Sequence, residues 1–328
     1  MQQARDGDNG WGKISPFWKS EPMLMPLSLS SSVNGKKITG MIMMAVAMLM
    51  VPGLDAVAKI LMERLPPLQV TFGRFLVQTI VLLPLFMMVP KRRTPVVGHV
   101  LAGFFLGLAL LSFNYALQVM PIANALAIFF VEPLVLTLLG AVLLRETLGF
   151  QRLGAIVIGL VGALIVLRPN LSTYGVTALF PLATAFLFSC YMLVTRRMSQ
   201  SRDLLLLQFW TGFFSALVLL IAVGLKLHFA PDAQSYLTPN IRELWLFLLL
   251  GLLAGLGHQL IIRALSFIEA GVAAPFQYLE IVSAIFLGWV VFGDFPDMRT
   301  WAGTIIIVCA GLYVIRCELR QTQAVNVL

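Results

Sequence analysis

The sequence places two glutamates inside long apolar stretches, where a charged side chain is costly. Glu132 lies in the run IFFVEPLVLTLLG, and Glu280 lies in the run PFQYLEIVSAIFLG. A carboxylate near the centre of a bilayer costs at least about 2.5 kcal/mol, so each must face protein or water. A carboxylate that meets water at that depth can bind a cation or a polar solute, or exchange a proton.

Pro133 adds an irregularity directly behind Glu132. Because proline has no N–H, the carbonyl of Phe129 loses its helical hydrogen-bond partner. A free carbonyl is tolerated inside a membrane only beside a cavity or another donor. We therefore expect this stretch to line an aqueous pathway. The alternative is a hydrogen-bonded glutamate that locks two helices together.

A second group of charges lies earlier in the chain, in and after the stretch PGLDAVAK. Asp55 and Lys59 are four residues apart, so they share one helix face and are able to pair. Arg74 lies at a similar depth in the next apolar segment. The three residues are predicted to form either an outer gate or an interfacial ion-pair network.

Amide and aromatic side chains accompany these charges. A cavity with amides, aromatic faces and two carboxylates suits a flat polar organic molecule better than a bare ion. His258 is either a substrate contact or a hydrogen bonder between helices. The candidate substrate or pathway residues are Glu132, Glu280, Asn114, Tyr115, Gln118, Phe129, Gln277, Tyr278 and His258.

The elements that position these residues follow from composition. Of the 328 residues, 59% are hydrophobic and 12% are charged, whereas soluble domains carry about 25% charged residues. The composition predicts an all-α integral membrane protein. The net charge of +8 comes from short basic clusters between apolar runs, which is typical of a membrane protein orienting itself rather than of nucleic-acid binding.

Crossing a bilayer takes about 20 apolar residues in a helix. Sixteen of the 23 Lys and Arg residues fall on one side of the predicted spans and six on the other, which predicts that both termini are cytoplasmic. Residues 1–37 and 317–328 are then cytoplasmic tails, the first of them mobile. The ten predicted spans are 38–60, 68–89, 97–119, 122–144, 151–168, 174–196, 204–226, 241–265, 271–293 and 298–316.

A shift of 148 residues aligns Glu132 with Glu280, which indicates an internal repeat. The predicted repeats cover residues 38–168 and 174–316, with five helices each. Because five is odd, the second repeat enters the membrane upside down. Inverted repeats are typical of secondary transporters, whose substrate lies near the midplane between the two halves.

Two small-xxx-small motifs also fall at this offset. Gly103 and Gly107 bound the motif GFFLG, and Gly251 and Gly255 bound GLLAG. Such pairs let helix backbones approach closely. They are predicted to be packing points between the two halves.

Motifs for chemistry are missing from the sequence, which favours a carrier over an enzyme. No Walker motif for ATP and no HExxH zinc motif is present. We expect no catalytic residues, cofactor, metal site or nucleic-acid partner, and a small-molecule substrate handled by a monomer or homodimer. The alternatives are a channel and a membrane-embedded enzyme or receptor.

Several stretches resemble the EamA family of the drug/metabolite transporter superfamily, over about residues 38–316. They include LPPLQVTFGRF, NYALQVMPIANALAIFFVEPLVLTLLG and APFQYLEIVSAIFLGWVVFGDFPD. Arg74 matches an arginine common in that family, whereas its second-half counterpart, Gly212, departs from it. Glu146 and Asp294 match an acidic position of the family.

The resemblance implies a ten-helix carrier of the bacterial inner membrane that works by alternating access. The stretch around Glu280 looks closest to uptake carriers for bulky cofactor-like compounds. The aromatic and amide-rich candidate site favours riboflavin as substrate. The alternatives are S-adenosylmethionine and an amino-acid-type or drug-type metabolite.

Overall fold

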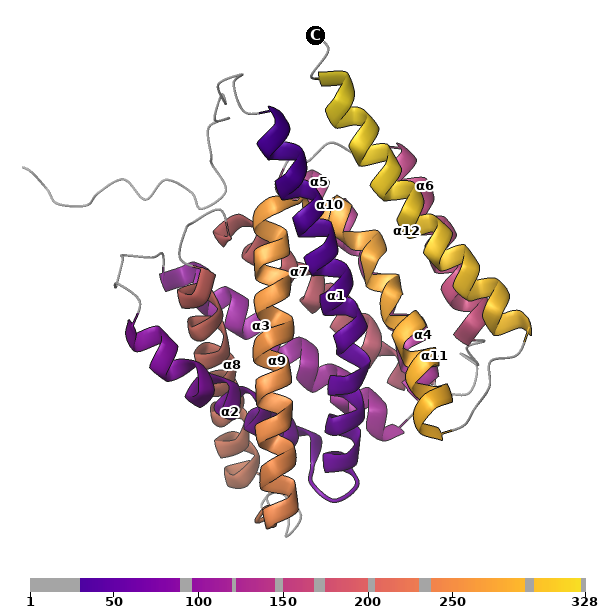
Figure 1. Ribbon diagram of the computed structural model, residues 1–328. Helices are drawn as coiled ribbons and strands as arrows, with labels where there is room; N and C mark the ends of the chain where they lie inside the picture. Colours follow the sequence, from indigo (N-terminus) through magenta and orange to yellow (C-terminus); the bar gives the residue numbers. More distant parts are fainter. Residues whose placement is uncertain are drawn as a thin grey trace, which may run out of the picture.

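The fold is a bundle of helices, seen in a computed structural model that describes residues 30–88, 96–119, 122–144, 150–167, 175–199, 204–229, 237–292 and 298–325. Within these residues the regular structure is helical throughout, without strands. Figure 1 shows the helices packed side by side. The prediction of an all-α membrane protein is confirmed, while the count of ten crossings stays a prediction.

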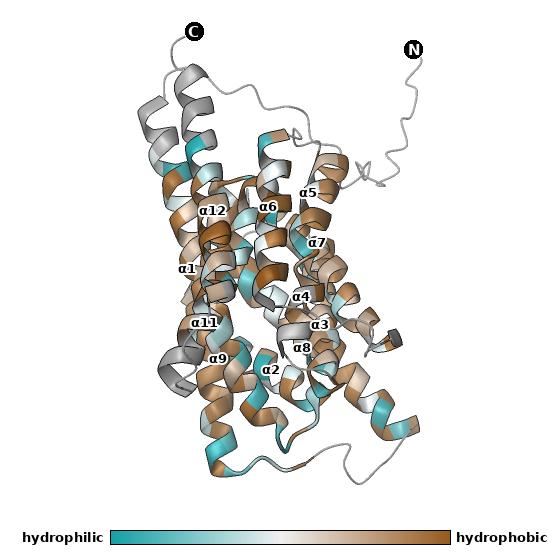
Figure 2. Ribbon diagram, turned by 90° about the vertical axis from the view of Figure 1, so that its right-hand side faces the viewer, coloured by the Kyte–Doolittle hydropathy of each residue, from teal (hydrophilic) through white to brown (hydrophobic). Residues whose placement is uncertain are grey.

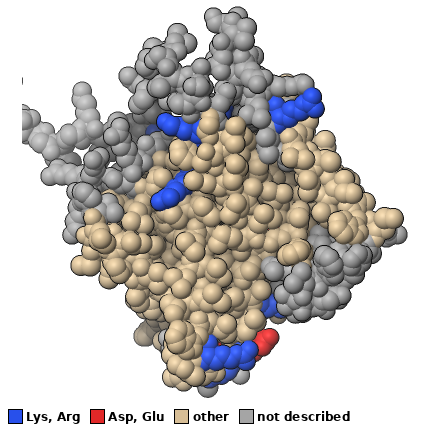
Figure 3. Space-filling model, in the orientation of Figure 1, with Lys and Arg blue, Asp and Glu red and all other residues tan. Residues whose placement is uncertain are grey.

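Six helices are long and apolar enough to cross a membrane by length and composition. Their outer surfaces carry many exposed large hydrophobic side chains. Figure 2 shows the helices hydrophobic over most of their length, and on the face in Figure 3 Lys and Arg gather toward the two ends. The six are α1 (Ser30–Met62), α2 (Pro67–Met88), α3 (Val96–Val119), α7 (Leu179–Met198, preceded by the 3-10 turn η2, Gly175–Ala178), α8 (Leu204–Phe229) and α9 (Ile241–Phe267).

Two of the remaining apolar segments are broken in the middle. The first consists of α4 (Ile122–Phe129) and α5 (Glu132–Leu143), and the second of α10 (Ala270–Ala273), the 3-10 helix η3 (Ala274–Tyr278) and α11 (Leu279–Phe292). Each break contains a proline in its first turn, Pro133 in α5 and Pro275 in η3. Proline cannot donate the helical hydrogen bond at its position, which explains why the helices are interrupted there.

The other two apolar segments are α6 (Phe150–Leu167) and α12 (Met298–Val325), which pack against each other. The largest of the remaining contacts join a helix of one half of the chain to a helix of the other half. Helix α1 packs on α9 and α11, while α7 packs on α3 and α5; α2 packs on α8. In the predicted repeat α1 corresponds to α7, α3 to α9, and α5 to α11, and each contact of α1 then has a counterpart among the contacts of α7.

Helix directions can be followed from contacts at one end of the bundle. Gly98, at the start of α3, contacts Met198 at the end of α7. Arg196, also at the end of α7, donates a 2.6 Å hydrogen bond to the carbonyl of Leu265 at the end of α9. Therefore α3 begins where α9 ends. Figure 1 shows α1 beginning and α12 ending at one side, which we call the terminal end.

The first and last helices are longer than the predicted spans. Helix α1 begins at Ser30, eight residues before the predicted start at 38, and α12 continues to Val325. Both extensions are polar, so they lengthen the helices beyond the apolar part of the bundle. The rest of the predicted N-terminal tail, residues 1–29, lies outside the described residues.

Close helix packing at the paired glycines is confirmed at two positions. A Cβ placed on Gly103 of α3 would lie 2.5 Å from the Cβ of Phe214 on α8, and one on Gly251 of α9 would lie 2.6 Å from Val77 on α2. At Gly255 nothing lies within 4 Å of an added Cβ, so the prediction is wrong there.

Gly103→Ala is expected to destabilise the protein, because its Cβ would also lie 2.8 Å from the backbone nitrogen of Ser215. Forcing this contact apart costs about 1–3 kcal/mol. The matched control is Gly255→Ala, which meets open space and removes a helix-interior glycine, a gain of up to about 1 kcal/mol. Thermal unfolding in detergent compares them; equal midpoints for both variants would contradict the packing argument.

Candidate functional site

The two helix breaks meet in the interior of the bundle. The hydroxyl of Tyr278 donates a 3.3 Å hydrogen bond to the carbonyl of Phe130, and the two ring centroids are 5.6 Å apart. In a continuous helix this carbonyl would accept from the N–H of Leu134, but that N–H bonds to Val131 instead. The freed carbonyl therefore finds its donor in the other half of the chain, from a residue 148 positions away.

Glu132 is fully buried at the start of α5, beside this contact. The hydroxyl of Ser189 on α7 lies 3.1 Å from its Oε1 and 3.3 Å from its carbonyl oxygen. Its second carboxylate oxygen, Oε2, has no hydrogen-bond partner within the described part of the chain. Gln277 of η3 lies near the carboxylate, yet its amide nitrogen makes no hydrogen bond to any described residue.

Glu280 joins Glu132 and Asp55 in one electrostatic group. It is only 5% exposed, and it lies within electrostatic range of both other carboxylates. The three acids come from α11, α5 and α1, which are distant in sequence. Glu132 and Glu280, which the 148-residue shift aligns, thus lie in one buried region, while their role in a pathway stays a prediction.

Arg74 of α2 supplies the basic member of the group. Its side chain is 7% exposed and lies within electrostatic range of Asp55, Tyr191 and His258. Its Cζ stands 5.8 Å from the ring centroid of Phe75. The Nε atom of Arg74 has no hydrogen-bond partner among the described residues, and neither has the hydroxyl of Tyr191.

Several of these buried polar atoms thus lack a hydrogen-bond partner among the residues that the structure describes. An unsatisfied buried polar group costs about 1–3 kcal/mol, so such groups normally meet water, an ion or a ligand. Two of these atoms, Glu132 Oε2 and Gln277 Nε2, lie beside the helix breaks, where a polar molecule would supply the missing partners. We call Asp55, Arg74, Glu132, Gln277 and Glu280 the central polar cluster.

Three of the predicted site residues have other surroundings. The amide of Asn114 donates a 2.8 Å hydrogen bond to the hydroxyl of Thr71, which ties α3 to α2. The ring of Tyr115 stacks on Phe180 with centroids 6.0 Å apart. Gln118 is exposed near the end of α3. Their sequence positions near the charges did not reveal which helix face they occupy.

Phe129 and His258 border the central polar cluster. Phe129 packs in an aromatic group with Phe113 and Phe188, at centroid distances of 5.8 and 6.0 Å. His258 is buried, with Nδ1 3.1 Å from the carbonyl of Ala254 and its ring edge toward Tyr191. Both residues are placed to shape the space around Arg74 and Glu132.

The three predicted gate residues are divided between the interior and the surface. Asp55 is half-buried and lies within electrostatic range of Arg74, whereas Lys59 is exposed. Arg74 is buried and belongs to the central polar cluster, so its charge lies in the interior and not at the mouth of the bundle. The acidic positions Glu146 and Asp294 lie outside the described residues.

Sequence reasoning missed an ion pair at the end of the bundle opposite the terminal end. The guanidinium of Arg64, in the turn after α1, lies 2.7 and 2.9 Å from the two carboxylate oxygens of Glu243. Glu243 also forms a capping box with Asn240, with hydrogen bonds of 2.7 and 2.9 Å. The N-x-x-E pattern before an apolar run was the available signal.

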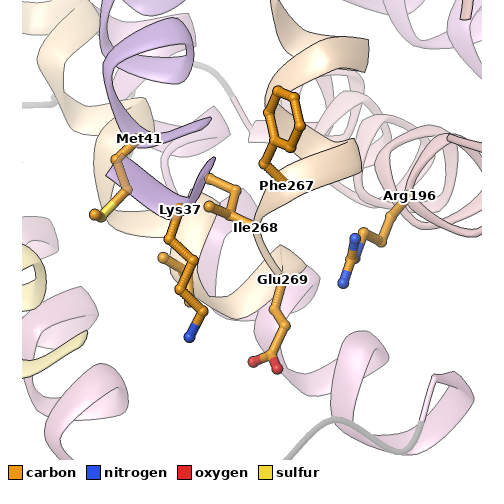
Figure 4. A pocket seen from close by; sticks show the side chains of 7 residues that line it. Lys37, Met41, Arg196, Phe267, Ile268 and Glu269 are labelled. Carbon is orange, nitrogen blue, oxygen red and sulfur yellow. The ribbon is translucent and has the colours of Figure 1, made fainter. Parts of the chain in front are cut away.

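A second pair of hydrogen bonds closes the same end. The amide nitrogen of Gln69 lies 2.5 Å from the carbonyl of Leu237, and the N–H of Leu237 donates 3.0 Å to the Gln69 side chain. Together, the Arg64–Glu243 and Gln69–Leu237 contacts join the α1–α2 turn to the start of α9. We call them the outer latch. At the terminal end, by contrast, a cavity of about 310 Å³ is present (Figure 4).

A helical bundle with an apolar exterior, broken helices and enclosed charges defines the class: a multi-pass membrane protein with a polar site inside. The sequence profile of the EamA-like transporter family matches residues 38–168 and 175–316. The chain therefore belongs to the EamA-like transporter family.

Two relatives of this chain are named as transporters of organic metabolites. An S-adenosylmethionine uptake transporter from Rickettsia bellii is 30% identical over 268 residues, which cover 80% of this chain and 89% of that protein. A riboflavin transporter from Vibrio cholerae is 28% identical over 265 residues, covering 79% and 86% respectively. The names indicate a metabolite transporter.

The fold also has a counterpart among solved structures. One crystal structure shares 20% sequence identity and matches with a TM-score of 0.67, over 84% of this chain and 97% of the other. At that identity the likeness concerns the fold alone.

Arg64→Gln is expected to loosen the outer latch. Val70 is buried behind it with Leu61, Leu65 and Phe247, so a Val70→Cys side chain should be shielded. A surface ion pair contributes up to about 1 kcal/mol, which corresponds to about fivefold faster labelling when it is lost.

Labelling of Val70→Cys with a membrane-impermeant maleimide measures this effect, after serine replaces the native cysteines. The control is Lys59→Gln, since Lys59 is an exposed cation on the neighbouring part of α1. Equal labelling rates with Arg64→Gln and Lys59→Gln would contradict a latch role for the ion pair.

Proposed function

We propose that this protein is a secondary carrier that takes up a charged organic metabolite across the bacterial inner membrane by alternating access. The observation that carries the proposal is the central polar cluster, in which Glu132 and Glu280 lie beside the two helix breaks and Asp55 is within electrostatic range of both Glu280 and Arg74. Unwound helices beside buried charges are how carriers of this general kind build midplane sites.

An inverted repeat is part of the proposal, and three observations support it. The contacts of α1 with α9 and α11 are repeated by α7 with α3 and α5. Helix α3 begins at the end of the bundle where its counterpart α9 terminates. Phe130 and Tyr278, which are 148 residues apart, contact each other, as expected of equivalent positions close to a two-fold axis.

The excess of basic residues on one side of the predicted spans supports a cytoplasmic terminal end. With this orientation the outer latch closes the periplasmic side of the central polar cluster. The cavity at the terminal end then lies on the cytoplasmic side. The conformation resembles the stage at which an uptake carrier has released its substrate inward.

The charges in the cluster favour a cationic or zwitterionic substrate. Carboxylates outnumber guanidinium groups there, so a molecule that brings positive charge lowers the repulsion among Asp55, Glu132 and Glu280. S-adenosylmethionine carries an ammonium and a sulfonium group together with one carboxylate. Its carboxylate suits Arg74, and its cations suit the glutamates. The Rickettsia relatives carry the same substrate in their names.

Riboflavin remains the second candidate, because of the aromatic group beside Glu132. Phe113, Phe129 and Phe188 offer ring faces to a flat heterocycle. Three side chains that made riboflavin attractive, Asn114, Tyr115 and Gln118, have the other surroundings described above. A neutral flavin would also leave the buried charges uncompensated. We therefore place S-adenosylmethionine first.

Reconstituted protein tests the proposal directly. Proteoliposomes should accumulate labelled S-adenosylmethionine with saturable kinetics, and an excess of unlabelled S-adenosylmethionine should compete while riboflavin competes weakly. Uptake of riboflavin alone would reverse the order of the two substrates. Absence of any flux, or a conductance that does not saturate, would refute a carrier and favour a receptor or a channel.

Glu132→Gln and Glu280→Gln should each reduce uptake of labelled S-adenosylmethionine at least about tenfold, because each removes a buried charge that binds a cation. The control is Glu63→Gln, since Glu63 is exposed in the turn after α1. Thermal unfolding midpoints are measured alongside. Normal uptake in both glutamate variants would show that these residues serve only as helix locks.

A further inference from the structure

The cavity at the terminal end is separate from the central polar cluster. It has a volume of about 310 Å³ and is lined by Lys37, Met41, Arg196, Phe267, Ile268, Glu269 and Val272. None of these residues belongs to the central polar cluster or to the outer latch. A volume of this size is within the lower range of small-molecule sites.

Three charged side chains from three different segments line this cavity. In the view of Figure 4, the Glu269 carboxylate lies between Lys37 of α1 and Arg196 of α7. A lining with two cations and one anion is complementary to a ligand that carries both signs of charge. A simple anion would gain from the two basic residues but would be repelled by Glu269.

Hydrogen bonds at the end of α9 and the start of α10 fix Arg196 and the backbone of Glu269. Arg196 is anchored by its 2.6 Å hydrogen bond to the carbonyl of Leu265. The carbonyl of Glu269 accepts hydrogen bonds from the N–H groups of Val272 and Ala273, at 3.1 and 3.0 Å, which start α10. The positions of the acid and the arginine are therefore set by the turn from α9 into α10.

The rest of the lining is apolar. Met41, Phe267, Ile268 and Val272 complete the lining. A ligand with a charged end and an uncharged body would match both parts of this surface. An inorganic ion would leave the apolar part unused.

One short segment of the chain connects the cavity with the central polar cluster. Glu269 and Val272 line the cavity, and Gln277 and Glu280 of the cluster follow in the next eight residues of the chain, through α10, η3 and the first turn of α11. A molecule that leaves the cluster along this segment reaches Glu269 next.

We propose that this cavity is a second binding site, which holds the amino-acid end of the substrate on its cytoplasmic side. Lys37 and Arg196 bind the carboxylate, Glu269 binds the ammonium group, and the apolar lining contacts the adjoining chain. The proposal rests on the proposed function for its substrate class. It assigns to the carrier a release site distinct from the central one.

Equilibrium dialysis of the purified protein with labelled S-adenosylhomocysteine tests the site without transport. This stable zwitterion should bind, methionine should displace it, and adenosine, which lacks the amino-acid end, should not. Glu269→Gln and Lys37→Gln should each weaken binding at least about tenfold, because each removes a charged partner.

The matched control is Arg263→Gln, since Arg263 is an exposed cation near the end of α9 and does not line the cavity. Equal affinity in Glu269→Gln, Lys37→Gln and the control would overturn the proposal, as would absence of binding to the wild type. Displacement by phosphatidylethanolamine but not by methionine would also overturn it and assign the cavity to lipid. Failure of the carrier itself would instead appear as absent uptake in proteoliposomes.

Discussion

The cost of holding charge away from water governs the whole structure. Four ionisable side chains, Asp55, Arg74, Glu132 and Glu280, lie in the interior of a bundle whose exterior is apolar. Mutual attraction and fixed dipoles offset only part of the desolvation of such groups. Among the residues that the structure describes, Ser189 is the hydrogen-bond donor that reaches Glu132. A polar molecule that enters the interior can therefore supply hydrogen-bond and charge partners to these side chains.

The same constraint explains the broken helices. A membrane interior allows free backbone carbonyls only where another group satisfies them. The hydroxyl of Tyr278, in the second break, satisfies the carbonyl of Phe130 in the first. The two breaks are thereby joined by one hydrogen bond. Gly103 and Gly251 bring neighbouring helices close enough to support this arrangement. The polar interior thus depends on the tight packing that surrounds it.

The helical membrane class and the break at Pro133 could be predicted from the sequence, because apolar length and proline act locally. The repeated position of the two glutamates was also visible as a fixed offset. Glu132 and Glu280 were found together by their offset of 148 residues, and the helical class followed from composition. The faces of Asn114 and Tyr115 could not be predicted, because helices that are apolar on all sides carry no periodic signal. The partner of Arg64 was also missed, since Glu243 is 179 residues away and only its local cap was visible.

The Phe130–Tyr278 contact lies in the interior of the bundle, whereas the Arg64–Glu243 ion pair lies at one end of it. In any rocking of two rigid halves, displacement grows with the length of the lever arm from the fulcrum. A contact where two interrupted helices cross moves least and can survive every stage of the cycle. The ion pair of Arg64 and Glu243 lies at the far end of that lever, where a small rotation separates its atoms. Under the proposed alternating access, the Tyr278–Phe130 hydrogen bond would stay near the axis of rotation, and the Arg64–Glu243 ion pair would separate in each cycle.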